Sequence, residues 1–178
     1  AFQGLAEFDR AEEWTIAMDR WCRRHATGGF HGLCRVHRAE ILRLRGDWDD
    51  AEVEALEASI ELRRYSRTDV GWALAELGQI RLRLGNLAGA EEAFLEAYEQ
   101  GWDPNPGLAL LRLAQGDVAA AAESIRDSLE NQPQIASLEA PPNTDLRRAP
   151  LLAAEVQIAA TADELGTARE AAVELDRK

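Results

Sequence analysis

A set of small and larger residues between positions 71 and 104 limits the possible folds of this chain more than any other part of its sequence. The positions that define the set are Leu77, Gly78, Gly85, Asn86, Ala90, Phe94 and Ala97. Gly78 lacks the side chain that would keep two helices apart, and Gly85 can take the left-handed conformation that ends a helix. Ala90 and Ala97 leave room for the Phe94 ring between them. The segment therefore predicts two antiparallel helices joined by a turn at 85–86.

The same pattern recurs before and after this segment. A forward shift of 31 residues aligns Leu108, Ala109, Gly116, Asp117, Ala121, Ile125 and Ser128. A backward shift of 39 residues aligns Ala39, Ile41, Gly46, Asp47, Ala51, Ala55 and Ala58. Apolar residues within the segments recur every three or four positions, and no segment alternates with period two. We therefore predict an all-α fold, a superhelix of stacked antiparallel helical hairpins with about eight or nine helices.

The repeats predict one domain over residues 1–178 and no second domain. Its units are a partial hairpin at 1–26 and full hairpins at 32–66, 71–104, 105–131 and 150–178. Three prolines predict a long connection at 131–149, and Gly28 and Gly29 predict a shorter one from His25 to Gly32. In the last hairpin, Asp163 and Glu164 replace the glycine turn.

Charge and composition restrict the location and partners of the chain. Twenty Lys and Arg face 32 Asp and Glu, a net charge of −12, so direct contact with nucleic acid is not expected. No stretch approaches the roughly 18 apolar residues of a membrane span, and no signal peptide opens the chain. Two cysteines make no disulfide framework. We expect a cytoplasmic protein without contact to membranes.

The order of large and small residues resembles the tetratricopeptide repeat (TPR), with Leu74 at the position of the family's first Trp and Pro104 near its closing Pro. Three longer strings also resemble the TPR-type region of bacterial LuxR-type transcriptional regulators. They are CRVHRAE at 34–40, LRLRGDW at 42–48 and PGLALLRLAQG at 106–116. In that family the region stands between an ATPase module and a DNA-binding helix-turn-helix. Neither the phosphate-binding loop of the former nor a basic recognition helix of the latter occurs in these residues.

The resemblance implies a binding groove along the first helix of each hairpin. Its outward positions correspond to His37, Glu40, Arg43, Trp72, Glu76, Gln79 and Arg83, with mostly apolar residues such as Leu110 and Leu113 in the third hairpin. This groove is mixed in charge and lacks the basic cluster that clamps a carboxylate or phosphate. Plain packing against a neighbouring helix is an equal alternative for Trp72. The partner would be a protein, a peptide or a small-molecule inducer.

Two other functions are set beside this one. Cys22, His25, Cys34 and His37 have the ligand types of a zinc site, although finger spacings normally pair Cys with Cys and His with His. The helix at 9–25 lacks most of its partner, which suggests self-association into a homodimer. The serines and histidines lack the context of a catalytic centre. We therefore expect a non-catalytic scaffold without a cofactor, the sensor or interaction region of a LuxR-type regulator. The alternatives are a dimerisation module, a free-standing TPR adaptor and, more remotely, a zinc-binding domain.

Overall fold

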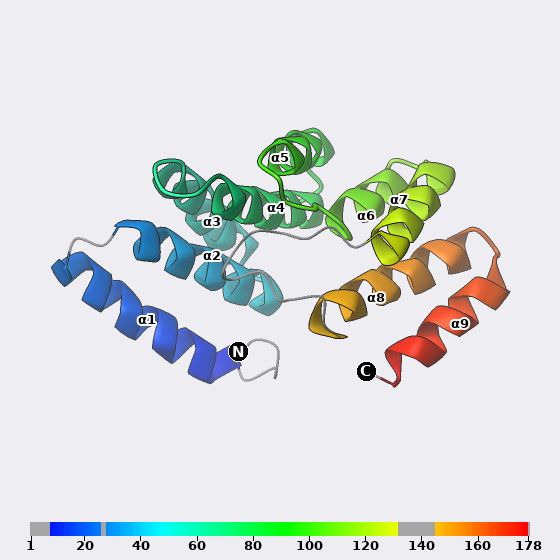
Figure 1. Cartoon of the computed structure of the whole chain (residues 1–178), viewed down its shortest axis with the longest axis horizontal. Coiled ribbons are helices and arrows are strands. Elements are labelled where there is room, and N and C mark those ends of the chain that lie inside the picture. Colours follow the sequence, from blue (N-terminus) through cyan, green and yellow to red (C-terminus); the bar gives the residue numbers. More distant parts are fainter. Residues whose placement is uncertain (1–7, 26–27, 132–144, 178) are drawn as a thin grey trace. The chain divides into compact units, whose positions relative to one another are not determined.

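The structure, a computed structural model, describes residues 8–25, 28–131 and 145–177. Within these ranges the chain forms nine α-helices and no strand (Figure 1). The helices are α1 (Phe8–His25), α2 (Gly28–Arg45), α3 (Trp48–Leu62), α4 (Arg67–Arg83), α5 (Leu87–Glu99), α6 (Gly107–Ala114), α7 (Val118–Glu130), α8 (Asp145–Thr161) and α9 (Leu165–Leu175). Successive helices pack against each other in pairs, which confirms the predicted all-α class of helical hairpins.

The chain divides into two compact units, with the boundary between Trp102 and Asp103. The prediction of a single domain is not decided by this division and stays a prediction. In the first unit α2 pairs with α3 and α4 with α5, while α1 packs on α2. Helix α2 also contacts α4 directly, although α3 separates them in sequence. The first helices of two successive hairpins therefore lie side by side.

Small residues allow the close packing of the first unit. Ala51, Ala55 and Ala58 on α3 and Ala93 and Ala97 on α5 are buried in a core with the leucines and valines of α2 and α4. Phe94 is also fully buried, and a Cβ on Gly78 would lie 2.5 Å from its ring. The predicted role of Gly78, a close approach between α4 and α5, is therefore confirmed.

The turns inside the hairpins repeat one hydrogen-bond pattern. Gly46, Gly85 and Gly116 all have positive φ, and each begins the turn after the first helix of its hairpin. After Gly85, for example, the N–H of Asn86 donates to the carbonyl of Arg81 at 2.9 Å. This bond spans five residues, as in the Schellman motif that ends helices at glycine. The three predicted glycine turns are thus confirmed at the level of the backbone.

The last hairpin makes the same turn without glycine. Asp163 has a φ of 60°, and the N–H of Glu164 donates to the carbonyl of Ala159 at 2.8 Å, again across five residues. An L-residue with a side chain adopts this conformation at a cost that glycine does not bear. Asp163 and Glu164 therefore replace the glycine turn as predicted, and the backbone of Asp163 is strained.

The second unit contains two hairpins, α6 with α7 and α8 with α9, and α7 also packs on α8. Its core contains Ile125 of α7 together with Leu151 and Ile158 of α8. Leu110 and Leu113 of α6 are half-buried against this core. These two leucines were predicted to line a groove, but their apolar side chains contribute to packing.

Two predicted connections are wrong at their ends. The shorter one, from His25 to Gly32, is reduced to residues 26–27, which lie outside the described residues, because α2 begins at Gly28. A Cβ on Gly32 would lie 2.7 Å from Leu62, so this glycine serves helix packing rather than a loop. The longer one, at 131–149, ends early because α8 begins at Asp145 and includes Pro150. Its residues 132–144 are outside the described part.

None of the helices in the described residues is long and apolar enough to cross a membrane.

Candidate functional site

An aromatic cluster lies where α2 meets α4. The rings of His37 and Trp72 meet edge to face, with centroids 4.8 Å apart and an angle of 77° between their planes. The other neighbour of Trp72 is Trp102, whose ring stacks at a centroid distance of 6.0 Å and an interplanar angle of 20°. Both tryptophans are half-buried and pack on the core of the first unit. The Trp72 ring therefore packs on the core, and the part of it that stays exposed can still line a groove.

Trp102 was not among the predicted site residues. It follows Gly101, which has a φ of 87° and ends α5, and its N–H donates to the carbonyl of Ala97 at 3.1 Å. An apolar residue after such a glycine commonly packs back on its own helix. Gly71 makes room for it, because a Cβ there would lie 2.6 Å from the Cβ of Trp102. Gly71 and Gly101 are the residues from which the position of Trp102 could have been predicted.

A buried ion pair lies one helical turn further along. Nε of Arg43 on α2 donates to Oε1 of Glu76 on α4 at 2.5 Å, and the Glu76 side chain is only 4% exposed. Burial lowers the pKa of the Arg43 guanidinium, but the charge and hydrogen bond of Glu76 together with the charge of Glu40 outweigh burial, so the pKa is raised. Arg43 therefore pairs with Glu76 in a mostly buried position, and its predicted role in a groove stays a prediction.

Glu40 lies one turn before Arg43 and is in a different situation. Burial raises its pKa, and the negative charge of Glu76 raises it further, while Arg43 and His37 lower it; the pKa is about 7. Two carboxylates thus share one guanidinium between α2 and α4. Arg43 donates its hydrogen bond to Glu76, and no donor among the described residues hydrogen-bonds to Glu40.

The predicted groove residues therefore separate into groups. The structure brings together His37 with Trp72, and Arg43 with Glu40 and Glu76. Gln79 is half-buried on α4, and Arg83 is exposed in the last turn of that helix. No ion pair connects Arg83 to another described residue. The candidate site is accordingly the half of the predicted groove around Trp72 and Glu40, extended by Trp102.

Other charged side chains near this site form ion pairs with each other. On α2, Arg35 contacts Glu54 at 2.7 Å and Glu61 at 3.0 Å, both on α3. The Glu61 carboxylate also lies 2.6 Å from Nδ1 of His31. Arg35 and Glu54 are less than one fifth exposed. These ion pairs connect α2 to α3, and their charged groups already have partners within the fold.

The four predicted zinc ligands do not form a site in the described part of the chain. No group of three or more His, Cys, Asp or Glu is placed there to hold a metal ion. Cys22 is buried in α1, Cys34 is half-buried in α2, and His37 packs on Trp72. The side chain of His25 lies outside the described residues. Metal analysis of protein purified without an affinity tag would test the zinc alternative directly.

A polar cluster in the second unit was also not predicted. The amide nitrogen of Asn105 donates to Oγ of Ser128 at 2.8 Å, and its oxygen accepts from Oγ of Ser124 at 3.1 Å. The same oxygen accepts the N–H of Ala109 in the first turn of α6 at 3.2 Å. Asn105 therefore connects the start of α6 to α7. The hydrogen bond from Asn105 gives the buried Ser128 hydroxyl a structural role.

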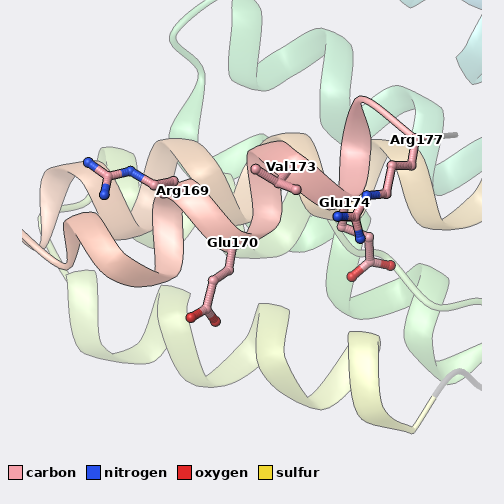
Figure 2. A pocket seen from close by; sticks show the side chains of 5 residues that line it. All are labelled: Arg169, Glu170, Val173, Glu174 and Arg177. Atoms are coloured by element: carbon pink, nitrogen blue, oxygen red, sulfur yellow. The ribbon is translucent and has the colours of Figure 1, made fainter.

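The surface of α9 carries a shallow depression (Figure 2). Its lining residues are Arg169, Glu170, Val173, Glu174 and Arg177. Figure 2 shows Arg177 beside Glu174, with Arg169 toward the other end of the helix. Glu174 already accepts hydrogen bonds from Arg148 at 2.5 and 3.2 Å. A depression along one helix with paired charges is a weaker candidate site than the aromatic cluster.

Comparison with known proteins identifies no relative of this chain. No protein-family model matches the chain, and neither curated proteins nor solved structures give a significant match.

Proposed function

We propose that this chain is a non-catalytic binding scaffold whose binding surface is the face shared by α2 and α4. The observation that carries the proposal is the cluster of His37, Trp72 and Trp102 beside the half-buried Glu40 carboxylate. Partly exposed aromatic rings next to a carboxylate suit a ligand that combines an apolar group with a hydrogen-bond donor or a cation. An extended peptide or a small-molecule inducer can both present such groups.

The electrostatics of the surrounding residues support binding rather than catalysis. Arg43, Arg35 and His31 each contact a carboxylate within the fold. Groups held in this way keep their positions, which favours a rigid recognition surface. A rigid surface loses less conformational entropy when a ligand binds, so less of the interaction free energy is needed to offset that loss.

Selection from a displayed random-peptide library, followed by calorimetry, tests the proposal. Peptides that bind the chain should lose about tenfold or more in affinity for Trp72→Ala, because a stacking surface contributes about 1–3 kcal/mol. Tyr98→Ala is the matched control, since Tyr98 is an aromatic residue 70% exposed on α5. Binding that survives Trp72→Ala and is lost in the control would refute the assignment of this face.

We further propose that the scaffold is the sensor or interaction region of a LuxR-type regulator. The strings at 34–48 and 106–116 support this reading, together with the arrangement in hairpins. The sequence of the parent gene tests it. A phosphate-binding loop upstream or a helix-turn-helix downstream is expected; a parent protein with neither would contradict the regulator role and leave the binding proposal standing.

A further inference from the structure

The charges between α2 and α4 do not balance. The carboxylates of Glu40 and Glu76 share the single guanidinium of Arg43. The side chains of Arg43 and Glu76 are 14% and 4% exposed, and Glu40 is half-buried, so water screens these charges only in part. When all three groups are ionised, one negative charge has no counter-charge. A mostly buried charge of this kind is costly unless a proton or a cation neutralises it.

Helices α1 and α3, which also pack on α2, do not supply a positive charge to Glu40. Among the described residues, Glu76 of α4 and Arg43 and His37 of α2 have the largest electrostatic effects on this carboxylate. The charged side chains of α1 whose positions are described are exposed. The charged groups at the contact of α3 with α2 are paired with each other: Glu54 and Glu61 with Arg35, Arg38 and His31.

The aromatic rings lie one helical turn from the carboxylates. His37 precedes Glu40 by three positions on α2, and Trp72 precedes Glu76 by four on α4. Residues at these spacings lie on the same side of a helix. In the other direction, the exposed Arg83 follows Glu76 by seven positions, or about 10 Å along the axis. A cation beside Glu40 therefore has apolar contacts on the side of Trp72 and a like charge on the side of Arg83.

We propose that the ligand of this surface carries an ammonium or guanidinium group joined to an apolar group, with the cation beside the Glu40 carboxylate and the apolar group against the exposed part of Trp72. The cation supplies the second positive charge that two carboxylates require. An anionic ligand would add a third negative charge, and a neutral ligand would leave the imbalance. The net charge of −12 also favours the approach of a cation. This inference rests on the proposed function, because it keeps the same surface and narrows its ligand.

The affinity for such a cation should depend on pH. Burial and the charge of Glu76 raise the pKa of Glu40 to about 7, so at lower pH a proton takes the place of the cation. Each further pH unit then weakens binding by up to about tenfold, because the proton must leave before the cation can pair with the carboxylate. Protonation of His37 would oppose a cation in the same direction. A substitution of Glu40 alone is therefore needed to separate the two groups.

Calorimetry with two synthetic probes of the same shape tests the preference for charge. Phenylpropylguanidinium is a cation from pH 5.5 to pH 8, and phenylpropylurea is its neutral counterpart. At pH 8 the guanidinium probe should bind the unaltered chain about tenfold or more tightly than the urea probe, because only the former makes a charge-assisted contact. Between pH 8 and pH 5.5 the affinity for the guanidinium probe should fall on the order of tenfold, while that for the urea probe changes little.

The Glu40→Gln variant assigns the effect to one carboxylate. It should lose the preference for the guanidinium probe at pH 8 and most of the dependence on pH, because its amide carries no charge. Glu92→Gln, at an exposed position of α5, is the matched control and should behave like the unaltered chain. Circular dichroism at both pH values checks that each variant is folded.

Two results overturn this inference and leave the proposed surface in place. Equal affinities for the two probes, both reduced by Trp72→Ala, would show a surface without preference for charge. A preference for guanidinium that persists in Glu40→Gln would place the cation elsewhere. Failure of both probes to bind at about 10 mM also overturns the inference, and the peptide selection then decides separately about the surface. Guanidinium binding that survives Trp72→Ala would count against both proposals, since both place the apolar group at Trp72.

Discussion

Replacing Glu40 by glutamine should change how the stability of the protein depends on pH. Burial and the neighbouring Glu76 raise the pKa of Glu40 from 4.5 to about 7 in the folded chain. At about 1.4 kcal/mol per pH unit, this difference corresponds to about 3 kcal/mol. Because the folded pKa is raised, the stabilisation is complete below pH 4.5, where Glu40 is protonated in both states. It is lost as the pH rises through 7.

Urea unfolding followed by circular dichroism between pH 5 and pH 8.5 measures this effect. Above pH 8 the unaltered chain must hold two carboxylates against one guanidinium, and the neutral amide of the Glu40→Gln variant removes that repulsion. This variant should therefore gain up to about 3 kcal/mol relative to the unaltered chain between pH 5 and pH 8.5. Glu92→Gln, at an exposed position of α5, should show no such relative gain. Parallel stability curves for the unaltered chain and Glu40→Gln would refute the reasoning.

Three further changes test individual features of the fold by denaturant unfolding. Asp163→Gly should stabilise the chain by about 1 kcal/mol, because glycine adopts the φ of 60° without steric cost; a loss of stability would contradict the strained turn. Gly78→Ala should cost about 1–3 kcal/mol, since its Cβ would lie 2.5 Å from the Phe94 ring, and an unchanged midpoint would show that the helices can separate freely. Arg43→Ala should cost about 3–5 kcal/mol because it leaves Glu76 buried without a counter-charge, and a change below about 1 kcal/mol would argue against that pair.

The candidate site could be predicted from the sequence only in part. Positions on the first helices of two hairpins follow from helical periodicity, and His37, Trp72, Arg43 and Glu76 do meet. Their states did not follow from the sequence. Arg43 was expected as a surface residue, but its partner is 33 positions away and the pair is buried. Such a pairing depends on the packing of α2 against α4, which no local pattern encodes.

The hairpins can be predicted from local sequence, because the signals that specify them act within a few residues. Gly85 ends a helix through its own backbone conformation, and Gly78 permits contact with a helix that begins only nine residues later. Three features became known only from the packing of the helices: where Trp102 stacks, why Gly32 belongs inside α2, and which of two carboxylates accepts the hydrogen bond of Arg43. These outcomes depend on burial and on contacts between residues about 30 positions apart, where desolvation and close packing outweigh local preference.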